Sequence, residues 1–423
     1  MKLNRNLKIS IIGLGYVGLP LAIEFSKLYE VIGYDINKKR IKELNQYIDI
    51  TNETPSKSLK KALSKNLTIT PLESDLKNSD VFVVTVPTPI TEKKTPDLSF
   101  LKSASQMVGR YLKTDNVVIF ESTVYPGCTE EDCVPILEAE SNLTYQKDFH
   151  CGYSPERINP GDKTHTLTKI KKITSGSSPE VADFVDTLYR SIIEAGTYRA
   201  STIKVAEAAK AVENIQRDLN ISLVNELAII FDLLDIDTKE VIDAAATKWN
   251  FMKFYPGLVG GHCISVDPYY LTYRSKKEGY KPELISSGRE INENITLFIA
   301  NKILKMLLKN KIAIIGSKCL ILGVTFKENC SDIRNSKVPK LYKELKEFGI
   351  DVDIYDPRAN EQEVFEEFKI NLIHELNSYD SIILAVGHQE FKKLNFLNLK
   401  RNSNAIIYDL KSFIDKEIVD GRL

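Results

Sequence analysis

The strongest constraint on the fold is a glycine pattern that follows the first apolar segment of the chain. Residues 8–12 are rich in isoleucine, which is typical of a buried parallel strand, and Gly13-x-Gly15-x-x-Gly18 comes directly after them. In such a pattern Gly13 permits a tight turn, Gly15 lets a pyrophosphate approach the backbone, and Gly18 lets a helix pack on the strand. The sequence therefore predicts a dinucleotide site, with the pyrophosphate at the N-terminus of a helix over residues 19–28.

The second strand ends at Asp35, and this acidic residue indicates which nucleotide to expect. A carboxylate at this place accepts hydrogen bonds from the adenosine ribose hydroxyls, which favours NAD over a dinucleotide with a phosphorylated ribose. Tyr16 and Val17 complete the expected cofactor loop. Arg40 is expected either to clamp the ribose or a phosphate, or to be a solvated charge on a helix.

Two further apolar strands, over residues 81–86 and 117–120, alternate with helical segments. This alternation predicts a doubly wound α/β sheet over residues 1–195. Ligands bind at the carboxyl ends of parallel strands, so the residues that follow these strands are candidates for contact with the nicotinamide ribose or the substrate, although a hydroxyl there can also simply cap a strand. These candidates are Pro87, Thr88, Ser122 and Thr123.

The remaining chain predicts a helical middle and a second α/β unit. Residues 201–234 form one helical pattern without Gly or Pro, long enough to join two domains and to offer a surface to a partner subunit. Residues 311–423 repeat the N-terminal order, with Asp356 in the place of Asp35. We therefore expect two Rossmann-like parallel-sheet domains, residues 1–195 and 311–423, joined by a helical region over residues 196–310.

Composition limits the functions open to such a chain. It has 423 residues, with 57 basic and 57 acidic side chains. A net charge of zero argues against bulk electrostatic binding to nucleic acid or anionic lipid. We see no signal peptide and no apolar run that could span a bilayer. The six cysteines have scattered spacings that form neither a disulfide framework nor a metal site, so the sequence predicts a cytoplasmic protein without a structural metal.

One cysteine, Cys263, follows a pair of glycines in a segment typical of a ligand-binding loop. Gly260-Gly261-His262-Cys263 is followed by Asp267, four residues after the cysteine. Paired glycines let the backbone approach a bound ligand, and a thiol held there can attack an electrophilic carbon. A cysteine in such a chain is otherwise most often a small buried hydrophobic residue. We interpret Cys263 as a nucleophile and assign no base role to His262.

Five motifs occur in order along nearly the whole chain, and together they resemble the UDP-glucose/GDP-mannose dehydrogenase family. The Ser154–Asp162 segment, residues 248–251 and His262 are most similar to the branch that acts on N-acetylhexosamines. Relatives of that branch oxidise UDP-GlcNAc or UDP-GalNAc to uronic acids for capsule and surface polysaccharides. The motifs are Gly13–Gly18, Ser154–Asp162, Lys210-x-x-x-Asn214, Gly260–Leu271 and Phe326–Arg334.

The resemblance implies a four-electron oxidation at C6 of a UDP-sugar, with two NAD consumed and Cys263 as the nucleophile. It also implies that Arg334 reaches the NAD from the C-terminal domain, that Lys327 contacts the UDP, and that the long helix forms a homodimer interface. The implied catalytic residues are Cys263, Lys210, Asn214, Asp267, Glu156 and Thr123. The implied substrate contacts are Glu156, Arg157, Lys210, Asn214, Phe254, Tyr255, Gly257, Gly260, Gly261, Phe326 and Lys327.

Elementary chemistry agrees with these roles. Lys210 and Asn214 lie four residues apart and share one helix face, where an ammonium and an amide can stabilise developing negative charge on one oxygen; otherwise they belong to a solvated stripe that includes Glu207. Asp267 can orient or deprotonate a water, and Glu156 can assist hydrolysis or simply pair with the neighbouring Arg157. Whether Lys210 or a water on Asp267 is the first base stays open.

The sequence departs from the family pattern at Tyr255, where many N-acetylhexosamine relatives carry Arg. Lys253 or Arg289 is a candidate to replace that Arg. The sequence does not separate UDP-GlcNAc, UDP-GalNAc and UDP-glucose. Two alternatives explain less: a two-electron hydroxyacid dehydrogenase would need no Cys263, and an NAD-sensing scaffold would need no catalytic set.

Overall fold

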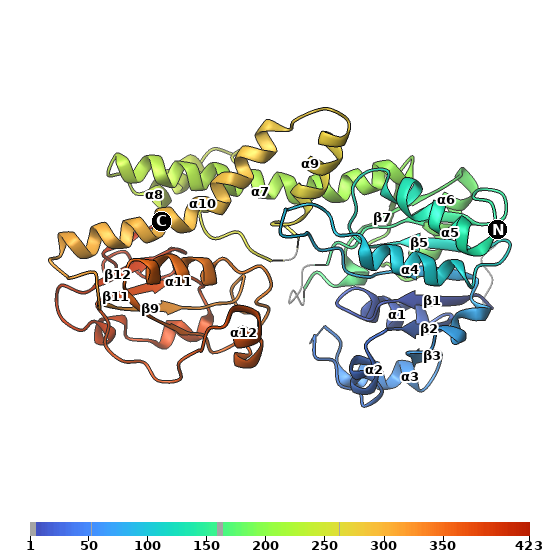
Figure 1. The fold of residues 1–423 in the computed structure, drawn as a ribbon, viewed down its shortest axis with the longest axis horizontal. Coiled ribbons are helices and arrows are strands. Elements are labelled where there is room, and N and C mark those ends of the chain that lie inside the picture. Colours follow the sequence, from blue (N-terminus) through green and yellow to red (C-terminus); the bar gives the residue numbers. More distant parts are fainter. Residues whose placement is uncertain (1–5, 52, 159–163, 262) are drawn as a thin grey trace. The chain divides into compact units, whose positions relative to one another are not determined.

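A computed structural model describes residues 6–51, 53–158, 164–261 and 263–423. The chain forms two compact units. The N-terminal unit consists of Met1–Glu213 and Tyr269–Tyr280, and the C-terminal unit consists of Asn214–Pro268 and Lys281–Leu423. Each unit contains one β-sheet, and Figure 1 shows the chain coloured from its N-terminus to its C-terminus.

The N-terminal unit is built on an eight-stranded sheet with the order β3-β2-β1-β4-β5-β6-β7-β8. The strands β1 and β4 are almost completely buried and β2 is mostly buried, as expected for apolar strands covered on both faces. The strands are β1 (Lys8–Ile12), β2 (Glu30–Tyr34), β3 (Leu67–Thr70), β4 (Val81–Val84), β5 (Val117–Phe120), β6 (His150–Tyr153), β7 (Lys172–Gly176) and β8 (Thr197–Arg199).

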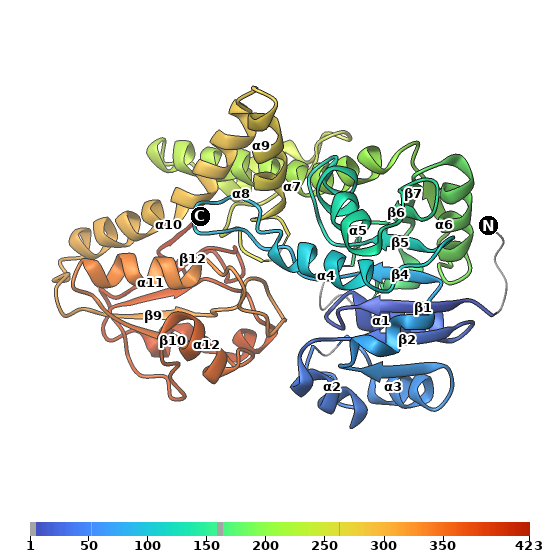
Figure 2. The ribbon, with the colours of Figure 1, turned by 45° about the vertical axis from the view of Figure 1, so that its right-hand side comes forward.

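Helices connect these strands, as the doubly wound pattern predicts (Figure 2). The helices are α1 (Gly18–Ser26), α2 (Lys38–Asn45), α3 (Ser56–Leu63), α4 (Ser99–Gly109), α5 (Val134–Ser141) and α6 (Pro179–Arg190), with a π-helical turn at Thr129–Cys133. The sheet differs from the predicted parallel one at a single pair, because β6 and β7 run antiparallel. Residues 154–171 join them, and the described part of this connection contains a 3-10 turn at Leu167–Lys169 but no α-helix. Antiparallel neighbours do not need a helical crossover.

The middle of the chain is helical, and its longest helix is α7 (Ile203–Leu233). This helix contributes residues to both units and begins and ends within two residues of the predicted pattern. It is followed by α8 (Thr238–Ala245), α9 (Asp267–Lys277) and α10 (Glu283–Lys309). Among the described residues, no helix combines the length and the apolar character needed to cross a membrane.

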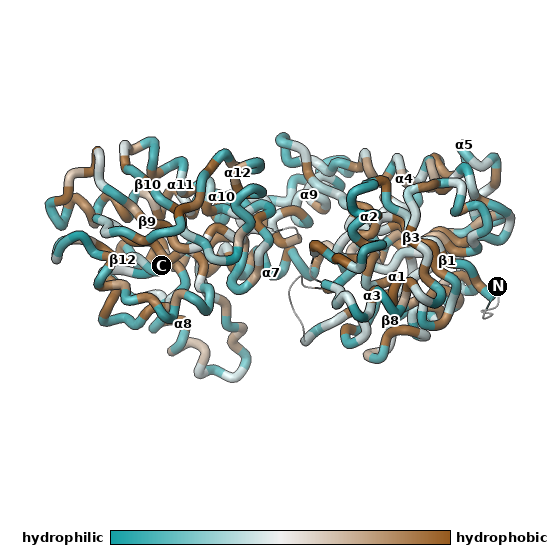
Figure 3. Tube along the Cα trace, turned by 90° about the horizontal axis from the view of Figure 1, so that it is seen from below, coloured by the Kyte–Doolittle hydropathy of each residue, from teal (hydrophilic) through white to brown (hydrophobic). Residues whose placement is uncertain are grey.

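The C-terminal unit contains a five-stranded parallel sheet with the order β10-β9-β11-β12-β13. Its buried strand residues form a hydrophobic core with residues of α10 and α11, and Figure 3 shows the chain coloured by hydropathy. The elements are β9 (Lys318–Leu322), α11 (Val338–Glu347), β10 (Asp351–Tyr355), α12 (Glu361–Phe368), β11 (Ser381–Leu384), β12 (Ile406–Asp409) and β13 (Gly421–Arg422).

The two sheets begin with the same local geometry. Gly13 and Gly323 follow the first strand of each sheet with φ values of 94° and 92°. Their N–H groups donate to the last carbonyl of the second strand at 2.8 and 2.9 Å. The next N–H along the chain donates to a carboxylate just past that strand, to Asp35 at 2.8 Å and to Asp356 at 2.6 Å. The repeat predicted from the sequence is therefore present down to its hydrogen bonds.

Candidate active site

The glycine loop of the N-terminal unit is open where a pyrophosphate is expected. A β-carbon built on Gly15 would meet no atom within 4 Å, so the backbone there faces open space. On Gly18 a β-carbon would lie 1.9 Å from the carbonyl oxygen of Gly13 and 2.5 Å from the hydroxyl of Thr85. The loop therefore fits a dinucleotide, because Gly15 leaves room for the phosphates and Gly18 lets α1 close on the strand.

Asp35 lies beside this loop and holds it with its carboxylate. Its two oxygens accept from the N–H groups of Leu14 and Asn37, each at 2.8 Å. A carboxylate has about four lone-pair sites, so both oxygens can still accept ribose hydroxyls. Ile36 is 81% exposed, and Leu72, which follows the neighbouring strand β3, is exposed as well. These two apolar side chains, which the sequence reasoning missed, offer a surface for an adenine ring.

Arg40 is buried, which contradicts the alternative of a solvated helix charge. Its Nε donates to the carbonyl oxygen of Leu14 at 3.0 Å, and its Nη2 pairs with Asp49 at 2.7 Å. The guanidinium thus fastens the glycine loop to the segment that follows α2. Any effect of Arg40 on the cofactor acts at least partly through the shape of that loop.

The residues after β4 and β5 have different duties. The Ser122 hydroxyl donates to the carbonyl oxygen of Val86 at 2.6 Å, so it ties the ends of two neighbouring strands together, as the strand-cap alternative describes. The carbonyl oxygen of Thr88 accepts from a tyrosine hydroxyl at 3.0 Å. Pro87 is exposed and Thr123 is partly exposed, so both remain available to a ligand.

A buried cluster of charges holds Glu156, and the sequence reasoning missed its centre, Lys172. The Lys172 ammonium lies 2.7 Å from Glu121 and 3.1 Å from Glu156, and the residue is 2% exposed. Tyr189 donates its hydroxyl to Glu121. Burial raises the pKa of the Glu121 carboxyl against the lowering effect of Lys172. Although burial acts to lower it, the two carboxylates raise the pKa of Lys172 above its usual range. The ammonium therefore stays charged.

The backbone completes the setting of Glu156. Its Oε1 accepts from the N–H groups of Arg157 and Ile158 at 2.5 and 2.6 Å. The guanidinium of Arg157 pairs with Glu213 at 2.7 Å, which corrects the alternative in which the Glu156 and Arg157 side chains pair with each other. The end of this motif, residues 159–162, lies outside the described residues, as does His262.

Lys210 and Asn214 are both buried and lie one turn apart on α7, as their spacing predicts. Lys210 belongs to the N-terminal unit and Asn214 to the C-terminal unit. Glu207 is not part of a solvated stripe, because it is fully buried and accepts from the N–H groups of Gly127 and Thr129 at 2.5 and 2.9 Å. Burial raises the pKa of the Glu207 carboxyl to about 7. These bonds anchor α7 within the N-terminal unit.

Cys263 lies in the turn that precedes α9, in the C-terminal unit, and its side chain is partly exposed. Its carbonyl oxygen accepts from the N–H groups of Val266 and Asp267 at 3.0 and 2.8 Å. The Ser265 hydroxyl closes the turn by donating to the carbonyl oxygen of Gly261 at 2.6 Å. The turn therefore carries Cys263 to the start of α9.

The glycine pair before Cys263 has a packing role, while the close approach to a ligand that the sequence predicts stays a prediction. A β-carbon on Gly260 would lie 2.8 Å from the carbonyl oxygen of Asn335, and one on Gly261 would lie 2.8 Å from the ring of Phe326. The Asn335 amide donates to the carbonyl oxygen of Gly261 at 3.1 Å. The pair therefore lets the cysteine loop lie directly against the segment that carries Phe326.

Two predicted catalytic residues meet within the C-terminal unit. The amide of Asn214 donates to the carboxylate of Asp267 at 2.6 Å, and the amide oxygen of Asn214 accepts from Arg217 at 3.1 Å. Asp267 is almost completely buried. The bond fixes the carboxylate four residues after Cys263, at the first residue of α9.

A buried polar network positions the loop before the cysteine, and no local sequence pattern announces it. The amide of Asn225 on α7 donates to the carbonyl of Gly257 at 3.1 Å and accepts its N–H at 2.8 Å. Asn225 also donates to Asn292 on α10 at 2.8 Å. Arg289 is buried against Asp218 at 2.6 Å, so it is not the replacement for the family's Arg that we considered.

The other candidate, Lys253, lies beside Tyr255 on the surface of the C-terminal unit. Its ammonium is 5.2 Å from the centre of the Tyr255 ring and 2.6 Å from Asp243. The Tyr255 hydroxyl donates to the same carboxylate at 3.2 Å. The neighbouring Phe254 is partly exposed. Lys253 therefore remains the candidate for the charge that Tyr255 lacks.

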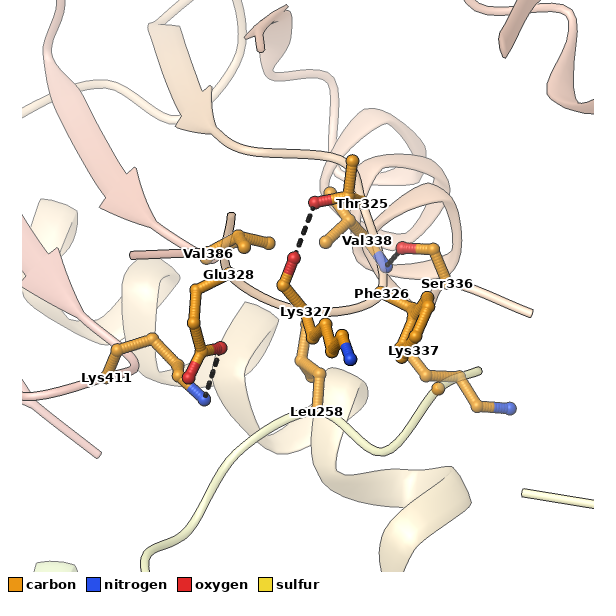
Figure 4. A pocket seen from close by; sticks show the side chains of 12 residues that line it. Leu258, Thr325, Phe326, Lys327, Glu328, Ser336, Lys337, Val338, Val386 and Lys411 are labelled. Carbon is orange, nitrogen blue, oxygen red and sulfur yellow. Dashed lines mark hydrogen bonds and ion pairs between the residues drawn. The ribbon is translucent and has the colours of Figure 1, made fainter. Parts of the chain in front are cut away.

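A small cavity of about 20 Å³, which we call the lysine-rich cavity, lies beside the 325–328 loop of the C-terminal unit. Its lining includes Lys327, Lys337 and Lys411 and one acidic residue, Glu328, whose carboxylate lies 3.8 Å from the Lys411 ammonium (Figure 4). Lys337 also pairs with Glu293 at 2.6 Å. An excess of ammonium groups suits a ligand that carries phosphates.

This cavity is not a second dinucleotide site of the N-terminal kind. Thr325 and Glu328 stand where the first repeat has Gly15 and Gly18. The carboxylate of Asp356 is fully buried, whereas that of Asp35 is accessible. The C-terminal unit thus keeps the fold of a nucleotide-binding repeat without the open glycine loop.

Arg334, expected to reach the NAD, folds back on Asp332 of its own unit, with a shortest separation of 2.5 Å. Its expected contact with the cofactor stays a prediction. The side chain is partly exposed, so the guanidinium can leave Asp332 without unpacking a core.

Comparison with known proteins connects these features. Residues 7–193 match the NAD binding domain of the UDP-glucose/GDP-mannose dehydrogenase family, residues 204–294 its central domain and residues 320–416 its UDP binding domain. UDP-N-acetyl-D-glucosamine 6-dehydrogenase of Pseudomonas aeruginosa is 53% identical over 99% of this chain and 100% of that protein. The chain belongs to the UDP-glucose/GDP-mannose dehydrogenase family.

Other relatives agree. The UDP-N-acetyl-D-glucosamine 6-dehydrogenase of Salmonella typhi is 52% identical over 98% of both chains. The solved UDP-D-ManNAc dehydrogenase of Pyrococcus horikoshii superposes with a TM-score of 0.89 at 32% identity and covers 98% of both chains. This family member is an NAD-dependent nucleotide-sugar dehydrogenase, with an NAD-binding N-terminal unit and a UDP-binding C-terminal domain.

The glycine loop yields a matched pair of predictions. For Gly15→Ala we expect an unchanged melting temperature but at least a tenfold loss of NAD affinity, because the added methyl group occupies open space that the phosphates need. For Gly18→Ala we expect both stability and NAD affinity to fall, because the methyl group strikes Gly13 and Thr85. Thermal melting and NAD titration check both variants, and a Gly15→Ala protein that binds NAD normally would contradict the assignment.

Proposed function

We propose that this enzyme oxidises C6 of UDP-N-acetylglucosamine to the carboxylic acid, by way of a thiohemiacetal and a thioester on Cys263. One observation carries the proposal. Within the C-terminal unit, the glycine pair of the cysteine loop packs on Phe326, which lines the lysine-rich cavity. In the same unit, Asn214 binds Asp267, the first residue of the next helix, α9.

The chemistry follows from these groups. NAD supplies a hydride acceptor when it is bound to the N-terminal unit. The Cys263 thiolate adds to the C6 aldehyde, which converts a poor hydride donor into a tetrahedral adduct that can lose a second hydride. The resulting thioester is cleaved by water, which releases the acid and the thiol. An alcohol and one water thus become an acid, with four electrons passed to two NAD.

The remaining residues are suited to stabilise negative charge and to activate water. Lys210 and Asn214 are suited to stabilise negative charge on the C6 oxygen, because an ammonium and an amide are hydrogen-bond donors held on one helix. Glu156, with its carboxylate fixed by two N–H groups and Lys172, is suited to assist hydrolysis of the thioester. The first base is either Lys210 or a water held by Asp267.

The choice of sugar rests on the relatives. The two proteins named UDP-N-acetyl-D-glucosamine 6-dehydrogenase are 53% and 52% identical to this chain, whereas a UDP-N-acetyl-D-mannosamine dehydrogenase of Pyrococcus horikoshii is 34% identical. To test the choice, the enzyme is incubated with NAD and, separately, with UDP-GlcNAc, UDP-GalNAc and UDP-glucose, and kcat/KM is compared. We expect the highest value for UDP-GlcNAc; a higher value for another sugar would reassign the substrate.

We also propose a homodimer that forms through α7. The helix exposes Val212, Leu223 and Ile230, apolar side chains that a second subunit would cover. Replacing Leu223 and Ile230 by Glu is expected to yield monomers in sedimentation equilibrium. Replacing the equally exposed Leu28 by Glu should leave the dimer intact; an unmodified protein that sediments as a monomer would contradict the proposal.

A further inference from the structure

His388 lies fully buried in the C-terminal unit, in the segment that follows β11. This segment also supplies Val386 to the lining of the lysine-rich cavity. The His388 Nε2 lies 3.1 Å from the carboxylate of Asp356, the residue that holds the backbone after Gly323. A buried titratable side chain therefore connects the strand ends of this unit to its ligand loop.

The hydrogen bonds of His388 determine its protonation. Its Nδ1 accepts from the backbone N–H of Asn329 at 2.9 Å, so this nitrogen carries no proton. The proton of the neutral ring is then on Nε2, directed at Asp356 and at the hydroxyl oxygen of Thr325, which lies 3.2 Å away. That hydroxyl in turn donates to the carbonyl oxygen of Lys327 at 2.9 Å.

The imidazole thus contacts both ends of the 325–329 loop, the Thr325 hydroxyl and the Asn329 N–H, and Asn329 holds the loop by further bonds. Asn329 has a left-handed φ of 61°, a conformation that needs support from its surroundings. Its side-chain oxygen accepts from the N–H of Gln389 at 3.0 Å, and its carbonyl accepts from Arg358 at 3.0 Å. The loop carries Phe326 and Lys327 into the cavity lining.

We propose that His388 is a positioning residue for UDP binding: its neutral imidazole holds the 325–329 loop in the binding shape, and a proton on Nδ1 releases that loop. The proposal rests on the UDP-binding domain alone, so it survives or fails independently of the proposed oxidation of UDP-GlcNAc.

The charged groups around the ring define what a second proton would do. Asp356, at the end of β10, faces Nε2 and favours the charged ring. Arg358 follows Asp356 by two residues, and Glu390 follows His388 by two residues. The guanidinium of Arg358 pairs with the carboxylate of Glu390 at 2.8 Å, so these two charges largely offset each other. At Nδ1 the ring meets the Asn329 N–H, and two donors cannot share one bond. Acid therefore strengthens the contact with Asp356 and breaks the contact with the loop.

Two amide variants separate the two ring nitrogens. In His388→Asn the amide oxygen can replace Nδ1, whereas in His388→Gln the amide reaches the place of Nε2. With the full-length protein at about pH 8, we expect His388→Asn to bind UDP within about threefold of the unmodified protein. We expect His388→Gln to bind UDP at least about tenfold more weakly, because the Asn329 N–H is left buried without an acceptor.

The measurement is calorimetric titration with UDP, with NAD affinity and thermal melting as checks that both units are folded. His374→Asn is the matched control, since His374 is an exposed histidine of the same unit. UDP ionises near neutral pH itself, so each variant is compared with the unmodified protein at the same pH, from about 8 down to about 5.5. The UDP affinity of the unmodified protein should fall toward acid pH relative to that of His388→Asn.

Equal weakening in His388→Asn and His388→Gln would overturn the proposal, because the ring would then only fill space. An affinity ratio between the unmodified protein and His388→Asn that does not change with pH would overturn the proton switch. If neither variant folds, titration of the unmodified protein with UDP-N-acetylglucosamine decides, since its diphosphate does not titrate in this range; a constant affinity would contradict the switch.

Discussion

Replacement of Cys263 with serine is expected to abolish formation of the uronic acid, with kcat lowered by at least about a thousandfold. A serine hydroxyl is not ionised at neutral pH and cannot form the thioester that carries the oxidation to the acid. The change replaces only the sulfur of a partly exposed side chain, so the turn, held by backbone bonds from Val266 and Asp267, should persist. Product analysis by mass spectrometry together with NADH absorbance measures the loss.

Binding provides the control for this variant. The affinities for NAD and UDP should stay within about threefold of those of the unmodified protein, because neither the glycine loop nor the lysine-rich cavity is altered. If Cys263→Ser forms the acid at an undiminished rate, the covalent route is wrong. If Cys263→Ser instead loses NAD or UDP binding, the variant is misfolded and Cys263→Ala replaces it in the experiment.

Removal of the buried ammonium in Lys172→Met is expected to lower the free energy of unfolding by about 3–5 kcal/mol at pH 8. The side chain is almost completely buried, and the change leaves Glu121 and Glu156 facing each other without their shared cation. Lys172→Arg should restore most of the loss, since a guanidinium can serve both carboxylates. Urea unfolding at fixed pH measures the difference.

The pH dependence of this deficit has a definite sign. Burial already raises the pKa of Glu121 in the presence of Lys172, so without the ammonium the folded protein should take up a proton more readily still. The folded state then binds more protons than the unfolded chain, and its stability falls as pH rises. The deficit of Lys172→Met should therefore be smaller at about pH 5 than at pH 8.

The adjacent lysine provides the matched control. Lys171 is exposed, and the bond that its carbonyl accepts from Arg157 does not involve its side chain. Lys171→Met should change the free energy of unfolding by no more than about 0.5 kcal/mol. Similar losses for the two methionine variants would show that the buried cluster contributes nothing special.

Sequence reasoning reached the features that are written in short, regular patterns. The run before Gly13, its glycine spacing and the acidic end of the next strand are local, so they predict the fold and the corresponding places of Asp35 and Asp356, whose hydrogen bonds the structure then shows to be alike. The length of α7 follows from the absence of Gly and Pro. The Lys210–Asn214 spacing also predicts a shared helix, because periodicity fixes which residues lie one turn apart.

The rest depends on pairings between segments that are distant in the chain. Lys172 meets Glu121 across 51 positions, and Asn225 meets Asn292 across 67. No periodicity specifies such partners. The same limit explains why the sequence did not reveal that Phe326 lies against the Gly260–Gly261 pair, and why Arg289, a buried link between helices, was considered as a replacement for the family's Arg.

The central claim is that one active site carries an alcohol to an acid. Its most direct test is the number of NADH molecules formed for each UDP-N-acetylglucosamine consumed, with NADH measured by absorbance and the sugar by chromatography. We predict two NADH per sugar, with the uronic acid as the product. One NADH per sugar, with an aldehyde as the product, would contradict the thioester route.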